Sequence, residues 1–315
     1  MFISFKLPLA GAAVLSVFLP LQANAAMFSK VYTFGDSLSD VGRLYALTGN
    51  AFPVSPPYDA GRASNGPLWI EYLQNSLGIT PNPADNFALN SATTGSTNTA
   101  PIPGLYGLQQ QIDSFPAGAD PNALYVIWAG ANDYLGGGVT DPTIPVTNLT
   151  NSIVNLYGKG AKNFLVVNLP DLGKTPLGLN SPASTALSSL SSAHDQLLKA
   201  SLNNLSQTLP GVDINPLDVF SLFNNVASNP GQYGLTNVTD ACLPTNPIGV
   251  PSGLPCSNPD QYFFWDALHP STRAHQIISA AAQRSLGVPE PSTVVALVSV
   301  GLLGAGVRLK QKTKV

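Results

Sequence analysis

Three apolar runs decide the fold of this chain: KVYTFG at residues 30–35, ALYVIWAG at 123–130 and NFLVVNLP at 163–170. Each run is rich in β-branched and aromatic residues and is apolar along nearly its whole length. Strands buried on both faces of a parallel sheet have this pattern, because helices cover both faces. Residues 85–89 and 212–216 are shorter candidate strands.

Helical periodicities separate these runs. Because strands and helices alternate along the chain, the sequence predicts an open α/β sheet that is covered on both faces. No internal repeat or linker interrupts residues 30–286, so we expect one domain. Residues 227–260 read as a long irregular excursion, and such loops are usually functional or held in place. The expected helices span residues 68–77, 106–115, 146–157, 186–209, 216–226 and 271–286.

The composition excludes several classes of protein. Of the 315 residues, 44% are hydrophobic and only 10% are charged, which excludes a disordered chain and a coiled coil. The 14 Lys and Arg residues face 17 Asp and Glu residues, for a net charge of −3. Since no basic run lies inside the domain, we expect no nucleic-acid partner.

The N-terminus has the features of an export signal. Lys6 precedes an apolar run over residues 7–21, and the small residues of Ala23-Asn24-Ala25 follow. This order predicts a secretory signal peptide over residues 1–25, which a signal peptidase removes. An uncleaved membrane anchor is the alternative interpretation.

The C-terminus also has three parts. Pro289-Glu290-Pro291 leads into an apolar run at residues 293–307, and the basic residues Arg308, Lys310, Lys312 and Lys314 follow. Such a run enters a bilayer as a marginal span, and the basic end stays on the cytoplasmic side. This tail, residues 288–315, resembles the PEP-CTERM sorting signal of Gram-negative bacteria. The resemblance implies transient insertion in the inner membrane, removal of the tail by an exosortase-type enzyme, and delivery to the cell surface or extracellular matrix. A permanent single-span anchor is the alternative.

Two cysteines lie 14 positions apart in the irregular excursion. Cys242 and Cys256 are the only cysteines of the chain. In an oxidising compartment we expect them to form one disulfide, which contributes about 3 kcal/mol in the chain-entropy model. A cysteine nucleophile is the weaker interpretation, because the chain offers a better one.

Three short motifs supply groups for nucleophilic catalysis. GDSLSD at residues 35–40 follows the first run, and its Ser37 sits on a turn where backbone N–H groups gather around an oxyanion. GAND at residues 130–133 follows another run, and the amide of Asn132 is a neutral donor to such a charge. DALHP at residues 266–270 holds His269 as a base, with Asp266 three residues before it as an orienting carboxylate.

These motifs, in this order, resemble the GDSL esterases and lipases of the SGNH hydrolase superfamily. RASNGPLW at residues 62–69 and VNLPDLG at 167–173 add similarity to the plant-type branch. The resemblance spans about residues 30–286. It implies a three-layer α/β/α, flavodoxin-like fold with a parallel five-stranded sheet, and a hydrolase domain over residues 26–287.

The resemblance also implies a role for each matching residue. Ser37 is the nucleophile, His269 the general base and later the general acid, and Asp266 its orienting partner. The oxyanion hole takes donors from the Ser37 backbone, the Asn132 side chain and the second motif of the family. There the chain departs from the pattern: in NFALNSATTG at residues 86–95, Ser91 replaces a glycine.

A serine at this position keeps the backbone N–H donor. If the position needs a positive φ, however, the Cβ of Ser91 adds strain. Gly95 is a weaker candidate for the same donor role. Loss of one oxyanion donor typically lowers the rate of a serine hydrolase about 10²–10³-fold.

The sequence therefore predicts an exported serine hydrolase that cleaves carboxylic esters through an acyl-enzyme. We expect no metal or organic cofactor. The substrate class stays open among lipids, small soluble esters and acetylated polysaccharide. A weak or inactive SGNH-fold protein that binds the matrix or its carbohydrate is the alternative, and an adhesin is less favoured because repeats are lacking.

Overall fold

Four parallel strands form the central sheet in a computed structural model that describes residues 27–246 and 249–288. The spatial order of the strands is β1-β2-β3-β4. Each neighbouring pair is parallel, so all four strands end at the same edge of the sheet. The strands are β1 (Val31–Gly35), β2 (Leu124–Trp128), β3 (Asn163–Val167) and β4 (Asp213–Leu217).

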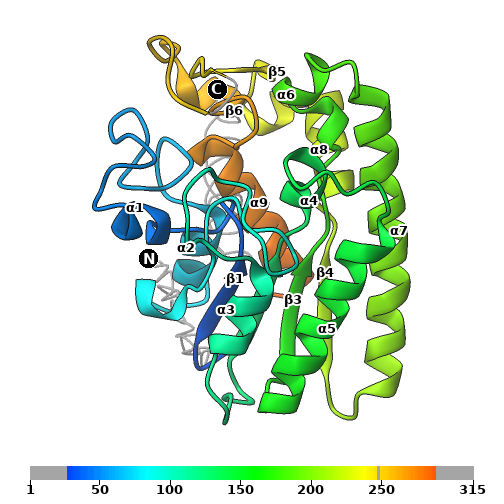
Figure 1. The fold of residues 1–315 in the computed structure, drawn as a ribbon. Helices are drawn as coiled ribbons and strands as arrows, with labels where there is room; N and C mark the ends of the chain where they lie inside the picture. Colours follow the sequence, from blue (N-terminus) through cyan, green and yellow to red (C-terminus); the bar gives the residue numbers. More distant parts are fainter. Residues whose placement is uncertain (1–26, 247–248, 289–315) are drawn as a thin grey trace, which may run out of the picture.

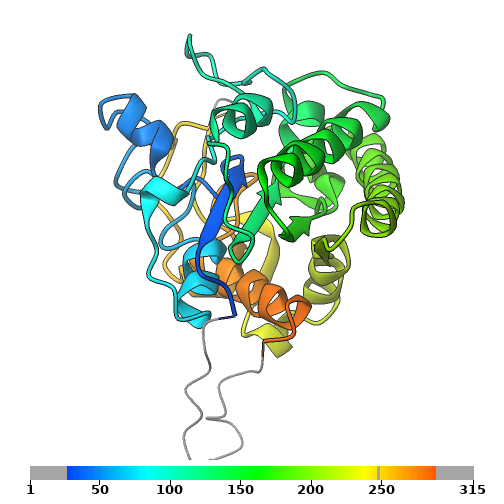
Figure 2. The ribbon, with the colours of Figure 1, turned by 90° about the horizontal axis from the view of Figure 1, so that it is seen from below.

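Helices cover both faces of this sheet, as Figures 1 and 2 show. Side chains of β2 alternate between the two faces: Tyr125 and Ile127 pack in one apolar cluster, and Leu124, Val126 and Trp128 in the other. The run at 123–130 lacks polar positions because both faces of its strand are buried. One cluster includes α3 (Leu108–Ser114), α5 (Thr143–Lys159) and α7 (Ser184–Thr208), and the other α2 (Trp69–Ser76) and α9 (Thr272–Ser285).

This architecture confirms the predicted α/β fold class, but the expected five strands are wrong by one. Residues 85–89 do not form a strand; Asn86 makes a single parallel bridge to Thr33. The segment still donates the Phe87 N–H to the Thr33 carbonyl at 2.7 Å and the Leu89 N–H to the Gly35 carbonyl at 3.0 Å. A regular ladder does not form beyond the bridge, because the Gly35 N–H donates to the side chain of Gln111 and not to this segment. Gln111 Oε1 accepts from the Gly35 N–H at 2.9 Å and its Nε2 donates to the Gly35 carbonyl at 2.8 Å.

The remaining elements are short, and most lie at the end of the sheet where the strands finish. Residues 227–260 are expected to be irregular, but β5 forms within them and pairs with β6. These elements are α1 (Arg43–Leu47), α4 (Ala131–Leu135), α6 (Pro176–Leu179), α8 (Val219–Ser228), β5 (Asn237–Ala241) and β6 (Tyr262–Phe264), with 3-10 turns η1 (Pro83–Asp85), η2 (Leu172–Lys174), η3 (Pro230–Tyr233) and η4 (Pro259–Gln261).

β4 forms one edge of the sheet and carries a proline. Asp213 donates its N–H to the Lys162 carbonyl, so the backbone groups of residues 213, 215 and 217 face β3. Those of the residues between them, Pro216 included, point away from β3. Pro216 has no N–H, and its carbonyl accepts a hydrogen bond from Ser285 Oγ at 2.9 Å.

The signal peptide predicted at 1–25 and nearly all of the tail at 288–315 lie outside the described residues. None of the helices in the described part of the chain has both the length and the apolar character of a membrane span.

Candidate active site

Residues from distant parts of the chain meet where the strands end. Ser37 follows β1 by two positions, and Asn132 lies in α4, just past β2. Asp266 and His269 lie on the loop between β6 and α9. Loops after neighbouring parallel strands converge at the carboxyl edge of such a sheet, which brings these groups to one crevice.

A continuous chain of hydrogen bonds joins three of these side chains. Ser37 Oγ lies 2.9 Å from His269 Nε2. On the other side of the ring, His269 Nδ1 lies 2.8 Å from Asp266 Oδ2 and 3.0 Å from Oδ1. Ser37 and Asp266 are nearly inaccessible to solvent, whereas the His269 side chain is 18% exposed. The imidazole therefore sits between a hydroxyl and a buried carboxylate.

Asp266 is held as an ionised carboxylate by several donors. Its Oδ1 accepts the backbone N–H groups of Leu268 at 2.8 Å and His269 at 2.7 Å, so the loop curls back onto its own aspartate. Its Oδ2 accepts the Tyr58 hydroxyl at 2.6 Å. Burial alone would raise the pKa of Asp266, but the charge of His269 and these hydrogen bonds bring it below its usual value.

The same pairing makes His269 a better base. Desolvation lowers the pKa of the imidazole, but the negative charge of Asp266 and its hydrogen bond raise it above the ordinary value, and Asp36 adds to this effect. A histidine in this setting is able to take a proton from Ser37 and hold it as an imidazolium.

Asn132 and Asp36 line the same pocket as Ser37. Asn132 Nδ2 donates to the Ala92 carbonyl at 3.0 Å and lies 3.4 Å from Asp36 Oδ2. The amide is thus fixed beside the nucleophile with one N–H on the backbone and the other in a long contact with Asp36. Burial raises the pKa of Asp36 to about 7, against an opposing hydrogen bond from the Leu38 N–H.

Ser91 occupies a left-handed backbone position, with φ of 63°. Its loop is tied to the nucleophile turn by Asp40, whose Oδ2 accepts the Asn90 N–H at 2.9 Å and the Leu44 N–H at 3.1 Å. Ser91 does not line the pocket that contains Ser37 and Asn132. Its role as an oxyanion donor therefore stays a prediction, and its positive φ is the case in which a Cβ costs strain.

The pocket beside Ser37 and His269 is lined mostly by apolar side chains. Carbon-rich side chains from α8, β6 and the end of β2 form an apolar wall, and Asp36, Ser37, Asn132 and His269 line the same pocket. An ester whose carbonyl carbon reaches Ser37 Oγ has an apolar cavity for one of its two substituents. The wall includes Trp128, Val219, Leu222, Phe223, Phe263 and Phe264.

The other two histidines lie away from the hydrogen-bond chain. His194 and His275 are at most 1% exposed. Burial lowers the pKa of His194 to about 4, and burial with the nearby charge of His269 lowers that of His275 to about 3. Both are neutral packing residues at neutral pH.

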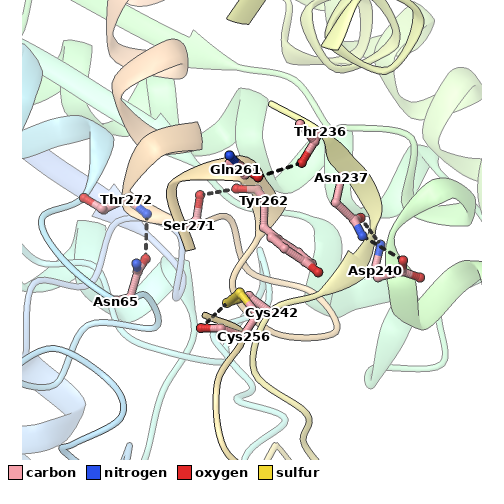
Figure 3. Close-up of a disulfide and its surroundings, with 10 residues drawn as sticks. All are labelled: Asn65, Thr236, Asn237, Asp240, Cys242, Cys256, Gln261, Tyr262, Ser271 and Thr272. Carbon is pink, nitrogen blue, oxygen red and sulfur yellow. Dashed lines mark hydrogen bonds between the residues drawn. A yellow bond between two sulfur atoms is a disulfide. The ribbon is translucent and has the colours of Figure 1, made fainter. Parts of the chain in front are cut away.

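The disulfide packs against the loop that bears Asp266. Cys242 and Cys256 are joined with their Cα atoms 4.9 Å apart (Figure 3). Cys242 shares an apolar cluster with Tyr58, Leu243 and Trp265, and Leu243 donates its N–H to the Trp265 carbonyl at 2.6 Å. The cross-link thus braces the residue that directly precedes Asp266.

Sequence reasoning missed two residues that touch the site. Asp36 stands inside the GDSLSD motif, and its position directly before Ser37 was the available signal. Tyr58 reaches Asp266 from 208 positions away, out of a proline-rich loop with no regular pattern. No local signal in the sequence could have paired them.

A family profile described as GDSL-like Lipase/Acylhydrolase matches residues 31–282. The chain belongs to this family. As a GDSL-family member it is a hydrolase that acts on ester bonds, as its sequence predicts. Residues 287–311 match the PEP-CTERM protein-sorting motif, which confirms the second resemblance and indicates export and sorting.

Curated relatives extend over most of this GDSL-family chain. A phosphatidylcholine-sterol acyltransferase of Aeromonas hydrophila is 29% identical over 312 residues, 81% of this chain and 89% of that protein. A GDSL esterase/lipase of Arabidopsis thaliana is 26% identical over 323 residues, 83% of each chain. Among solved structures, a carbohydrate acetylesterase from Sinorhizobium meliloti is 16% identical with a TM-score of 0.48, covering 82% of this chain and 99% of that one.

Proposed function

We propose that this protein is an exported serine esterase that forms an acyl-enzyme at Ser37, with His269 as general base and Asp266 as its orienting partner. The observation that carries the proposal is the unbroken hydrogen-bond chain from Ser37 Oγ through His269 to Asp266 at the wall of an apolar pocket. Three such groups in this order are the constellation that activates a serine hydroxyl.

In the first half of the reaction, Ser37 Oγ attacks the ester carbonyl carbon while His269 Nε2 takes the hydroxyl proton. The carbonyl π electrons move to oxygen and give a tetrahedral oxyanion. The bond to the alcohol oxygen then breaks, and His269 delivers its proton to that oxygen. Asp266 remains ionised throughout and stabilises the imidazolium.

Three donors are proposed for the oxyanion: the Ser37 N–H, the Asn132 amide and the Ser91 N–H. The Asn132 amide is already held rigidly by the Ala92 carbonyl, so little reorganisation is needed when charge develops. Its second N–H makes only a long, 3.4 Å contact with Asp36. A substrate oxyanion would replace Asp36 as the acceptor of this N–H, because it would form a shorter, charge-assisted hydrogen bond.

In the second half, water replaces the alcohol. His269 takes a proton from the water, whose oxygen attacks the acyl carbon, and the bond to Ser37 Oγ breaks as the proton passes to that oxygen. The products are a carboxylic acid, an alcohol and free enzyme. The reaction balances without a cofactor.

The apolar wall favours a substrate with a hydrocarbon chain over an acetyl ester. Burial of each further methylene against side chains such as Phe223 and Phe264 stabilises the complex by about 0.8 kcal/mol. The Aeromonas relative, named for phosphatidylcholine, supports a lipid ester as the substrate class.

The proposal extends to processing and destination. A signal peptidase removes residues 1–25, the hydrolase domain spans 26–287, and an exosortase-type enzyme cuts the tail at 288–315 after its transient insertion in the inner membrane. The PEP-CTERM match at 287–311 supports delivery to the surface or matrix of a Gram-negative cell.

A second candidate is a weakly active or inactive protein that binds the matrix. The positive φ of Ser91 favours it, because strain at this residue would displace an oxyanion donor. The two candidates differ in whether Ser37 is activated.

A fluorophosphonate probe tests this difference, since it reacts covalently only with an activated serine. We expect one adduct on Ser37 by intact mass and peptide mapping, and none in the His269→Ala variant. A folded wild-type protein without an adduct would establish the second candidate. A series of p-nitrophenyl esters from acetate to decanoate then tests the substrate class, with kcat/KM expected to rise with acyl length.

A further inference from the structure

A tyrosine far from the motifs contacts the carboxylate of the hydrogen-bond chain. We propose that Tyr58 is a positioning residue: its hydroxyl fixes the carboxylate of Asp266 so that Oδ2 faces the Nδ1 proton of His269, and it adjusts the basicity of that imidazole. The inference rests on the proposed function and adds a residue to its machinery.

The contact is short, buried and of fixed polarity. Tyr58 is 4% exposed, and its hydroxyl lies 2.6 Å from Asp266 Oδ2. Burial and the neighbouring carboxylate raise the pKa of the phenol above its ordinary value. The hydroxyl therefore stays protonated and donates to Asp266 at every working pH.

Both oxygens of Asp266 lie near His269 Nδ1, but their other partners differ. Oδ1 is 3.0 Å from Nδ1 and accepts two backbone N–H groups from its own loop, those of Leu268 and His269. Oδ2 is shared between His269 Nδ1 and the Tyr58 hydroxyl. Without Tyr58, Oδ2, the oxygen nearer to the imidazole, would lose its second hydrogen-bond partner, and the carboxylate would rotate more freely about its side-chain bond.

Tyr58 itself is held in place. Its ring packs edge-to-face on Trp265 with centroids 6.5 Å apart, in the same cluster as Cys242 of the disulfide. A rigid donor fixes its acceptor, because little conformational freedom remains to be lost when the hydrogen bond forms.

The segment that carries Tyr58 is also fastened on the far side of His269. Ser64 Oγ donates to the Pro270 carbonyl at 2.9 Å. Asn65 Oδ1 accepts the Thr272 N–H at 2.8 Å, as Figure 3 shows. Contacts on both sides of His269 thus come from one segment, which aligns the loop as a unit.

The hydroxyl also changes the field at the imidazole. The charged and titratable groups that face His269 are Asp266 on its own loop, Asp36 after β1 and His275 on α9. The Tyr58 proton offsets part of the negative charge of Asp266. Deleting the Tyr58 hydroxyl removes this partial positive charge, so the negative charge of Asp266 acts more strongly on His269 and raises its pKa further.

Tyr58→Phe tests the inference, because phenylalanine keeps the ring in its cluster and deletes only the hydroxyl. We expect kcat to fall about 10-fold with KM nearly unchanged, in the range of one hydrogen bond to a charged group. We also expect the acid limb of the pH profile to move to higher pH, both for ester hydrolysis and for the rate of fluorophosphonate labelling at Ser37.

Tyr125→Phe is the matched control. Tyr125 is also a buried tyrosine, and its hydroxyl donates to the Asp120 carbonyl at 3.0 Å, at the other end of the sheet from Ser37. We expect this variant to lose some thermal stability while its kcat stays within twofold of wild type and its pH profile does not move.

The outcomes distinguish a failure of the proposed role of Tyr58 from a failure of the proposed function. If wild type reacts at Ser37 and Tyr58→Phe keeps its kcat and acid limb, the role of Tyr58 is overturned while the proposed function stands. A lower melting temperature with an unmoved pH profile also overturns it, since that result assigns Tyr58 to the fold alone. A wild-type protein with neither hydrolysis nor labelling overturns the proposed function and this inference with it.

Discussion

Two histidines of this protein have opposite chemistry although both are enclosed by the same fold. His269 has a carboxylate at Nδ1, and its pKa is raised. His194 is wholly buried, its Nδ1 contacts the Tyr134 hydroxyl at 2.9 Å, and its pKa falls to about 4. Burial alone thus makes a histidine inert, and a neighbouring aspartate makes it a base. The partner of the ring, more than its depth, decides what it does.

The largest expected effect comes from removing the reactive member of this pair. His269→Ala leaves Ser37 without a base, and we expect kcat for ester hydrolysis to fall about 10⁴–10⁶-fold. The melting temperature should change little, because the ring is partly exposed. Ser37→Ala should give the same loss, since the groups act as a unit. Retention of more than a few per cent of the activity by either variant would contradict the proposed roles.

Asp266→Asn should remove the difference between His269 and His194. The amide keeps the shape of the side chain but removes its charge, so the pKa of His269 should fall, as in His194. We expect kcat to drop about 10³–10⁴-fold near neutral pH. Hydrolysis rates across pH 5–9 measure this effect, and an unchanged profile would show that the carboxylate charge does not support the base.

His194→Gln probes the inert member through stability and not through activity. A buried histidine with a depressed pKa stays neutral in the folded state, while the unfolded chain takes up a proton below about pH 6.5. Stability from His194 is therefore present above this pH and is lost as pH falls toward 4. The stability difference between wild type and variant should shrink by about 3 kcal/mol between pH 7 and pH 4.

Urea unfolding at several pH values measures this difference. Buried Asp36 and Asp195 have pKa values raised to about 7 and about 8, which act in the opposite direction, but they are common to both proteins and cancel. A difference that stays constant with pH would mean that His194 titrates normally in the folded protein.

The smallest expected effect lies at Ser91, which neither histidine contacts. Glycine adopts a positive φ without a Cβ penalty but costs more chain entropy on folding. Ser91→Gly should therefore raise stability by only about 0.5–1 kcal/mol. A melting curve measures the gain, and kcat should stay within a few fold because the backbone N–H is retained. A loss of stability would show that Ser91 is not strained.

Most of the framework was predictable because its signals are local. The apolar runs at 30–35, 123–130 and 163–170 predict buried strands directly, and the strands at 31–35, 124–128 and 163–167 lie within them. Asp266 was predictable as a partner of His269 because three residues separate them. The strand expected at 85–89 is wrong because Gln111, a distant side chain, accepts the Gly35 N–H that a strand there would use.

The features that escaped prediction depend on contacts between distant segments. Tyr58 is recognisable only when the loop at 58–65 is laid against the loop at 266–272. Ser91 has a left-handed conformation, which is not a preference of serine, and it follows Asn90, whose N–H is bound by the distant Asp40. Short elements such as α6 are too brief to show a period.

Pro216 affects how this protein behaves at high local concentration. An open sheet edge has free N–H and C=O groups, and another chain can pair with them by adding a strand, which is a common start of aggregation. At Pro216 the outward donor does not exist and the outward acceptor is already occupied by Ser285. The carboxyl end of the β4 edge is thus closed to strand addition. Neighbouring molecules of this protein at high concentration cannot pair with it there.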